Sequence, residues 1–209
     1  MPSETSVAAP PSAVMIWRLR AQHLLGRNGA FVALVLLGAV MTALSRVFLT
    51  TQNLLNVGVQ AAVVAILAFG QTFVIITAGI DLSVGSVAAL SGIVVGYTSG
   101  SMGLNPLLAI LLGLLSGVAT GLVSAVMIAY GRLPAFIATM AMLSIARGFA
   151  LVISGGRPVP QPHQVAWFGK TIGGWLPVPL LVMVVLGLVA SFILNRTYAG
   201  RVMYAIGGN

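Results

Sequence analysis

One acidic residue, Asp81, stands inside the long apolar part of this chain, and the next nearest acid along the sequence is Glu4. Glycines and hydroxyl side chains surround it in the run Gly79-Ile80-Asp81-Leu82-Ser83-Val84-Gly85-Ser86. A carboxylate among membrane-length apolar segments costs several kcal/mol if it faces lipid. We therefore expect Asp81 to line a cavity, to meet a partner or to cap an interrupted helix.

Two interpretations of this motif are compatible. In the structural one, Gly79 ends a helix, Asp81 or Ser83 caps the next, and Gly85 leaves room beside its first turn. In the functional one, the broken helix exposes backbone groups to a translocation path, lined by Gly79, Asp81, Ser83, Gly85 and Ser86. A helix start already neutralised by a carboxylate is a poor anion site, so the pattern favours a neutral or hydroxyl-rich cargo.

The composition is that of an integral membrane protein, with 59% hydrophobic and 6% charged residues and a mean hydropathy of +1.09. The net charge of +8 comes from Lys and Arg residues scattered singly between apolar runs, which indicates membrane topology and not nucleic-acid binding. Cysteine is absent, which excludes disulfides and thiolate metal sites. His23 and His163 have no neighbours with metal-ligand spacing, so the sequence predicts no metal and no cofactor.

The apolar runs are long enough for helices that cross a bilayer and too long for barrel strands, because a crossing takes about 20 residues. We therefore expect an all-α, polytopic membrane helix bundle with about six crossings and a broken helix at Gly79 to Gly85. The expected crossings are Asn28 to Ser45, Leu54 to Ala78, Leu82 to Gly100, Pro106 to Tyr130, Pro134 to Ile153 and Leu176 to Leu194.

The predicted domains are a disordered, basic N-terminal tail over 1–27, a transmembrane domain over 28–195 and a short cytoplasmic segment over 196–209. The first apolar run is expected to be a retained helix and not a cleaved signal peptide. A cytoplasmic N-terminus satisfies the positive-inside rule. It places Arg18, Arg20, Arg27, Arg132, Arg196 and Arg201 inside and leaves Arg46, Arg157 and Lys170 outside.

Arg147 falls within the fifth expected crossing, where it either snorkels to the outer interface or pairs inside the bundle. The glycine- and proline-rich segment from Ser154 to Trp175 cannot span the membrane and is the longest external loop. Its aromatic residues are expected to be interfacial anchors. They are Trp167, Phe168 and Trp175.

Two glycine ladders with a spacing of four lie on the third and fourth expected crossings, which are joined by a turn around Asn105-Pro106. Such stripes let membrane helices approach closely, so the two crossings are expected to form a tight antiparallel hairpin. The ladders are Gly92, Gly96 and Gly100, followed by Gly113, Gly117 and Gly121.

After the sixth crossing the chain is basic and amphipathic, with Tyr198, Val202, Ala205 and Ile206 on one helical face. Gly207 and Gly208 are expected to stop this helix. The pattern suits either a position on the membrane surface or docking into a partner, and composition leaves both open.

Three segments of the chain resemble the permease subunits of bacterial ATP-binding-cassette importers of the ribose, xylose and arabinose group, to which autoinducer-2 permeases are related. The most specific is ITAGIDLSVGS at residues 76–86. The others are GRLPAFIAT at 131–139 with ARG at 146–148, where the family more often has Val or Ile at Leu133, and TYAGRVMYAIGGN at 197–209.

The resemblance implies an inner-membrane importer in which two permease copies form the pathway, two cytoplasmic ATPases drive it and a periplasmic protein delivers the sugar. The chain itself would not be an enzyme, and it has no Gly-x-x-x-x-Gly-Lys-Ser/Thr loop. Binding-protein docking is expected at Arg157 and Lys170. The expected ATPase-coupling residues are Tyr198, Gly200, Arg201, Tyr204, Gly207 and Asn209.

Family members are about half as long again, so the resemblance implies that this chain stops within the domain, as a truncated product or a fragment. The rival from another class is an ion-coupled secondary transporter that uses Asp81 as a relay. A membrane enzyme would need a convergent acid, base or metal set, which one Asp and two remote histidines do not supply.

Overall fold

The computed structural model describes residues 13–161, 165 and 167–208, with side chains from residue 29 onward. The expected disordered stretch Met1–Ser12, as well as His163 and Asn209, lies outside the described residues. The chain divides into two compact units, Met1–Leu54 and Leu55–Asn209. The boundary between the two units lies near the start of the second apolar helix, and the domain bounds expected from the sequence stay a prediction.

The first unit is dominated by the helix α1 (Ala13–Leu44). Residues 13–27, grouped by sequence with the disordered tail, are therefore helical. The apolar part with described side chains, Gly29–Leu44, is shorter than a full membrane span. After it, the Asn53 side-chain amide donates to the Phe48 carbonyl over 2.8 Å and closes the turn that leads into the next helix.

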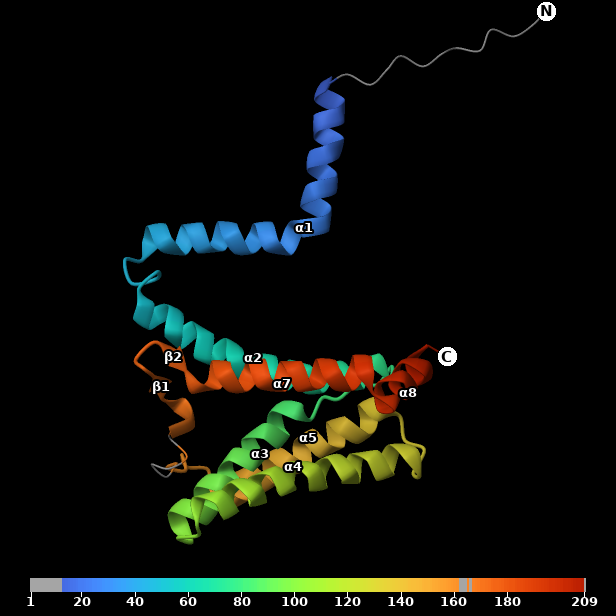
Figure 1. Cartoon of the computed structure of the whole chain (residues 1–209). Helices are drawn as coiled ribbons and strands as arrows, with labels where there is room; N and C mark the ends of the chain where they lie inside the picture. Colours follow the sequence, from blue (N-terminus) through green and yellow to red (C-terminus); the bar gives the residue numbers. More distant parts are fainter. Residues whose placement is uncertain (1–12, 162–164, 166, 209) are drawn as a thin grey trace, which may run out of the picture. The chain divides into compact units, whose positions relative to one another are not determined.

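The second unit is built from helices that match the expected crossings (Figure 1). Five helices in the described part of the chain are long and apolar enough to cross a membrane, which confirms an all-α polytopic fold. They are α2 (Thr51–Ile76), α3 (Val84–Gly96) with its π-helical extension η1 (Tyr97–Ser101), α4 (Pro106–Ala129), α5 (Ala135–Ser154) and α7 (Val178–Arg196), and the short helix α8 (Tyr198–Gly207) follows.

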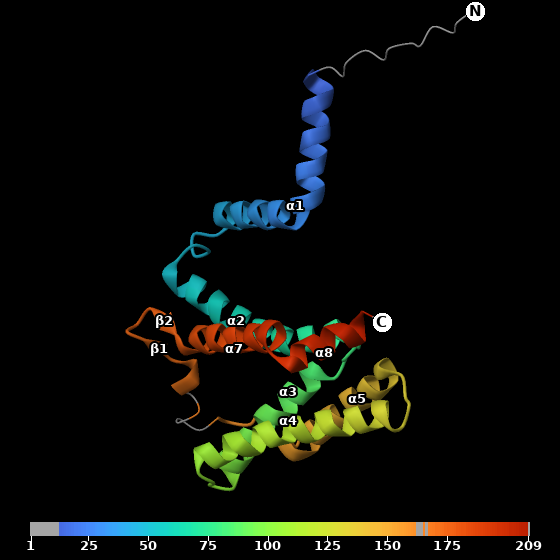
Figure 2. The same ribbon diagram turned by 45° about the vertical axis from the view of Figure 1, so that its right-hand side comes forward.

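Small side chains lie where these helices touch. α3 packs against both α4 and α5, and the three run side by side in Figures 1 and 2. Leu90 on α3 forms a buried cluster with Ala146 and Ala150 on α5. Large apolar side chains point outward instead, among them Leu122 with 61% of its surface exposed. This inverted pattern is typical of membrane helices, because lipid is as apolar as the protein interior and small residues allow close packing.

The α3–α4 hairpin is antiparallel, as expected, and its contacts show which residues pack between the two helices. A Cβ at Gly113 would meet the Ser91 carbonyl oxygen at 2.9 Å and also the Val95 side chain, and one at Gly117 would lie 3.3 Å from Ser91 Oγ. The row Val87, Ser91, Val95 of α3 therefore fits against the glycines of α4. The Ser91 and Ser116 hydroxyls add a hydrogen bond of 3.2 Å across the pair.

The glycine ladder of α3 belongs to a different face, which corrects its assignment to the hairpin. A Cβ at Gly96 would lie 2.6 Å from Gln161 Nε2, and one at Gly100 would lie 3.3 Å from the Pro160 carbonyl oxygen. Gln161 Nε2 also donates to the Gly92 carbonyl over 3.1 Å. A Cβ at Gly92 or Gly121 would meet no atom within 4 Å. The α3 glycines thus seat the external loop against the helix.

That loop contains a small hairpin that the sequence did not predict. The 3-10 turn η2 (Trp167–Gly169) precedes strands β1 (Thr171–Ile172) and β2 (Leu176–Pro177), which pair antiparallel with Thr171 opposite Pro177. Gly173 and Gly174 take positive φ angles of 63° and 76° at the turn, a backbone conformation that glycine adopts without strain. Trp167 and Phe168 make an edge-to-face ring pair at 5.5 Å.

Candidate functional site

The helical winding stops between Ile76 and Val84, as the sequence predicted. The Ala78 N–H donates to the Ile75 carbonyl and the Gly79 N–H to the Val74 carbonyl, each over 3.0 Å. This pair of bonds is a Schellman helix end, in which one residue takes the left-handed conformation. That residue is Ala78, with φ of 56°, and not Gly79 as expected.

Gly79 has a different purpose from the one predicted. A Cβ there would lie 3.1 Å from Val74 Cγ1 and 3.2 Å from the Val74 carbonyl oxygen. The absent side chain therefore lets the chain pass close to the last turn of α2, so that glycine is required by space and not by backbone angle.

Asp81 folds the unwound segment onto itself. Its Oδ1 accepts two hydrogen bonds of 2.7 Å, one from the Ser83 N–H and one from the Ser83 hydroxyl. Ser83 occupies the N-cap position of α3 with helical backbone angles (φ −82°, ψ −16°) and makes no side-chain cap bond, while its hydroxyl donates to Asp81. The expected cap by Asp81 or Ser83 is thus replaced by a turn that precedes the helix, and Ser83 is only 4% exposed.

Two side chains that the sequence did not single out hold this segment. Gln71 Nε2 on α2 donates to the Asp81 carbonyl over 2.6 Å. Thr139 on α5 is 4% exposed, and its hydroxyl lies 3.2 Å from the Ile80 carbonyl oxygen while it also lies 2.8 Å from the Ala135 carbonyl oxygen of its own helix, so the two acceptors share one hydroxyl hydrogen. Thr139 lies one turn inside α5, so the break runs beside a candidate membrane span and not beyond its end. The sequence feature that could have indicated these contacts is Gln71, an isolated amide side chain within an apolar run.

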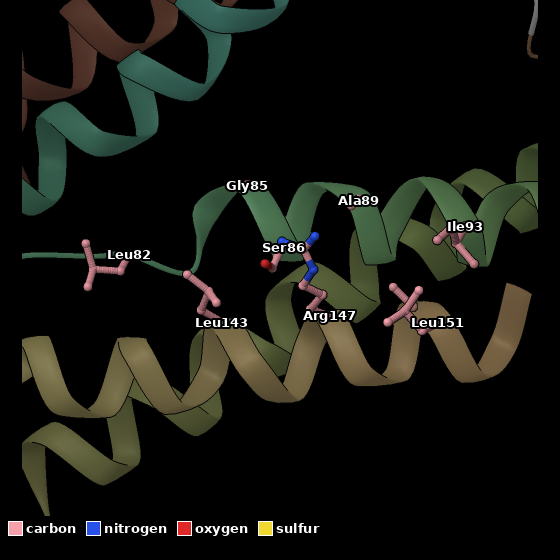
Figure 3. A pocket seen from close by; sticks show the side chains of 9 residues that line it. Leu82, Gly85, Ser86, Ala89, Ile93, Leu143, Arg147 and Leu151 are labelled. Carbon is pink, nitrogen blue, oxygen red and sulfur yellow. The ribbon is translucent and has the colours of Figure 1, made fainter. Parts of the chain in front are cut away.

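A cavity of about 470 Å³ opens next to the break, between the start of α3 and the middle of α5. Figure 3 shows the Arg147 side chain extending from α5 toward Ser86 on α3. Arg147 lines this cavity, but its side chain is exposed and the described residues give it no hydrogen bond or ion pair, so neither pairing inside the bundle nor snorkelling is established. Gly85 also lines the cavity, and a Cβ there would meet nothing within 4 Å.

The short helix α8 begins at a sharp corner after α7. Thr197 caps it by accepting the Gly200 N–H over 3.3 Å and donating to the Ile193 carbonyl over 2.6 Å. A Cβ at Gly200 would meet the carbonyl oxygens of Ile193 and Leu194, so only glycine fits this corner. The compact helical element expected after the sixth crossing is present, and the expected part of Gly200 in ATPase coupling stays a prediction.

The far end of α8 reaches the break. A Cβ at Gly207 would meet the carbonyl oxygen of Ile76, the last residue of α2. Two predicted sites that are far apart in sequence, the C-terminal segment and the Asp81 motif, are thereby brought together. Gly207 therefore lies against the residue at which α2 ends.

Large side chains around α8 are exposed. Tyr198 is 75% exposed, Tyr204 51% and Ile206 58%. Arg201 lies over the Tyr198 ring with its Cζ 5.9 Å from the ring centre. The predicted apolar face of Tyr198, Val202, Ala205 and Ile206 is mostly exposed, with Val202 partly buried.

Arg157 and Lys170 are both exposed on the external loop. They follow the C-terminal end of α5 and precede the N-terminal end of α7, which are the ends opposite Thr139 and Thr197. Among the described residues, no three His, Asp or Glu side chains could hold a metal ion. The site around Asp81 can therefore position oxygen and nitrogen atoms by hydrogen bonds, but it offers no acid and base pair.

The chain matches the model of one protein family over most of its length. Residues 53–209 match the family described as the permease component of the branched-chain amino acid transport system. This range includes every described residue of the break, the α3–α5 cavity and α8.

Several curated relatives are sugar permeases. The ribose import permease protein of Escherichia coli strain K12 is 40% identical over 86% of this chain and 57% of its own length. The ribose import permease protein of Bacillus subtilis strain 168 is 37% identical over 92% of the chain and 60% of the relative. The D-allose transport system permease protein of Escherichia coli strain K12 is 34% identical over 99% and 62%. The chain thus spans about three fifths of the length of these relatives, and no solved structure gives a significant match.

Proposed function

Because the chain belongs to the family of permease components of the branched-chain amino acid transport system, we propose that it is the membrane-spanning subunit of an ATP-driven, binding-protein-dependent importer. The proposed cargo is a monosaccharide or similar neutral polyol, since ribose and D-allose appear in the names of relatives at 34–40% identity. The chain supplies the path, and a separate subunit hydrolyses ATP.

The observation that carries this proposal is the contact between Gly207 and Ile76. It joins a short, exposed, aromatic helix to the end of α2, where the backbone unwinds. An ATPase that displaces α8 would also displace the end of α2, because Gly207 lies directly against the Ile76 carbonyl oxygen. The unwound segment from Thr77 to Ser83 is then the part that changes conformation. It is held to its neighbours by single hydrogen bonds and not by the regular backbone bonds of a helix.

The proposed sequence of events has two states. With α8 in one position, the Gln71 and Thr139 bonds hold the break as described above; with α8 displaced, the break and the start of α3 move relative to α5. ATP-driven closure of the partner subunits biases this equilibrium toward the displaced state. The cavity between α3 and α5 changes shape as a consequence, because its lining comes from both helices.

The remaining partners follow from the same proposal. A periplasmic sugar-binding protein would dock on the external loop at Arg157 and Lys170, whose positive charges suit an acidic surface. The loop is attached to α3 by the hydrogen bond from Gln161 to the Gly92 carbonyl. Docking on the loop would therefore act on α3 from the side of this helix that lies away from the break. A second permease copy would complete the pathway, in the bacterial inner membrane, with the N-terminus in the cytoplasm.

The proposal is tested by uptake into proteoliposomes that contain the chain with its cognate ATPase and binding protein. We expect labelled ribose or allose to accumulate when ATP is supplied and to stop when ATP is depleted. Collapse of the proton and sodium gradients with ionophores should leave uptake unchanged. Uptake that follows the ion gradient and ignores ATP would favour an ion-coupled transporter using Asp81 instead.

A further inference from the structure

The cavity between α3 and α5 has few polar groups, and they lie close together. Most of its lining is aliphatic, with Ile93, Leu143 and Leu151 among the side chains. The polar side chains are Ser86 from α3 and Arg147 from α5, which face each other in Figure 3. A volume of about 470 Å³ lies within the usual range for small-molecule sites, about 300–1,000 Å³.

Arg147 is the group that most needs a partner. Its guanidinium carries five N–H donors and does not lose its charge. It lies in the second half of α5, a candidate membrane span, where its side chain is exposed at the mouth of the cavity, and no acceptor for it is found in the part of the chain that the structure describes. A charged donor in an apolar setting is costly when its hydrogen bonds are unmade. Oxygen atoms of a bound molecule would supply what the described residues do not.

The surroundings favour a neutral molecule over an anion. The carboxylate of Asp81 lies in the turn before α3, bonded to Ser83, so the start of this helix already has a negative group beside it. The N-cap residue Ser83 makes no side-chain bond to the first N–H groups of α3, and a Cβ at Gly85 would meet nothing within 4 Å, so a ligand can approach the first turn. A molecule with several hydroxyl oxygens and an uncharged carbon frame matches this arrangement.

We propose that the α3–α5 cavity binds one neutral sugar, with the Arg147 guanidinium and the Ser86 hydroxyl donating hydrogen bonds to its hydroxyl oxygens. The aliphatic side chains of Ile93, Leu143 and Leu151 contact the carbon frame. This inference rests on the proposed function for the class of cargo, and it adds the site. The cavity lies beside the break, so the displacement proposed for α3 would open or close it around the sugar.

The test uses the absence of cysteine from the chain, because a single introduced thiol can then be labelled selectively. Ala89 lines the cavity, and the Ala89→Cys variant is placed in phosphatidylcholine nanodiscs. Its labelling rate by a small thiol reagent is measured with and without D-ribose or D-allose. We expect saturating sugar to slow labelling several-fold. Leu122→Cys, on α4 and outside the cavity lining, is the matched control and should label at the same rate with or without sugar.

A second substitution assigns the effect to the polar pair. Arg147→Gln combined with Ala89→Cys should lose the protection but unfold at the same temperature as the parent. Arg147→Gln combined with Leu122→Cys should label at the same rate as Leu122→Cys alone. Ser86→Ala should weaken protection less, because it removes one donor and keeps the guanidinium. If Arg147→Gln does not fold, the Ser86→Ala result alone decides whether the polar groups contribute.

Two results would overturn the proposal. One is equal labelling of Ala89→Cys with and without either sugar. The other is protection that appears in phosphatidylglycerol nanodiscs without sugar, which would make the cavity an anionic-lipid site. Neither result depends on an ATPase, so this inference can fail while ATP-driven uptake is observed, and the reverse outcome is equally distinguishable.

Discussion

Gln71 Nε2 lies 2.6 Å from the carbonyl oxygen of Asp81, so a side chain of α2 binds the backbone that follows the helix after its end. A backbone carbonyl released from a helix inside a membrane has no water to accept from and must find a donor in the protein. Gln71 supplies that donor. The break is therefore a specified conformation, held from α2 by Gln71 and from α5 by Thr139.

Replacing Gln71 by Leu should destabilise the break. The Asp81 carbonyl would lose its partner at a part-buried position, which costs about 1–3 kcal/mol. We expect a lower midpoint of thermal unfolding in nanodiscs. Thr72→Val is the matched control, because the exposed Thr72 hydroxyl bonds only within its own helix, to the Ala68 carbonyl, and its loss should change the midpoint little.

Ala78→Val should destabilise the chain more than Ala68→Val. A β-branched side chain in the left-handed region is strained, and such strain costs of order 1–3 kcal/mol. Ala68 lies within the regular part of α2, where Val costs less than about 0.7 kcal/mol. Ala78→Gly should be tolerated. Equal unfolding midpoints for the two valine variants would show that Ala78 does not take a positive φ.

Asp81→Asn should separate insertion from transport. The Asn Oδ1 can still accept the Ser83 N–H and hydroxyl, so we expect normal insertion and an intact turn. Bonds to a neutral acceptor are weaker by about 1 kcal/mol than those to a charged one, so ATP-driven uptake should fall several-fold. Membrane fractionation and uptake are measured on the same preparations, and unchanged uptake would remove the carboxylate from the mechanism.

Gly113→Ala and Gly121→Ala compare two rungs of one glycine ladder on α4. A Cβ at Gly113 would meet the Ser91 carbonyl and Val95, whereas one at Gly121 meets nothing within 4 Å. Overpacking typically costs about 1–3 kcal/mol, so only Gly113→Ala should lower the unfolding midpoint by several degrees. If both variants behave alike, the α3–α4 contact described above is wrong.

The sequence predicted the helical class, the break and the compact C-terminal segment, because each depends on local chemistry. A lone acid between glycines interrupts an apolar run whatever tertiary contacts the following segment makes. What sequence could not give was which neighbour each helix face meets. A spacing of four places Gly92, Gly96 and Gly100 on one stripe, but only the folded loop, through Gln161, determines that the stripe packs outside the α3–α4 hairpin.

The same limit explains why the structural roles of Ala78 and Gly207 could not be predicted from the sequence. Glycine is the usual left-handed residue at a helix end, so Gly79 was the reasonable prediction, yet the bonds from the Ala78 and Gly79 N–H groups put Ala78 there and leave Gly79 to provide space. Gly207 looked like a helix stop in the sequence. Its contact with Ile76 joins residues remote along the chain, and no local pattern specifies such a pair.

The central claim is that α8 moves the break through Gly207, and the most direct measurement is sugar taken up per ATP hydrolysed in the reconstituted complex. In Gly207→Ala the added methyl would displace α8 from Ile76, at a cost of about 1–3 kcal/mol, so we predict that hydrolysis continues while uptake per ATP falls roughly tenfold. Gly70→Ala on α2, where a Cβ meets nothing within 4 Å, should keep the parent ratio. A parent-like ratio in Gly207→Ala would contradict the account.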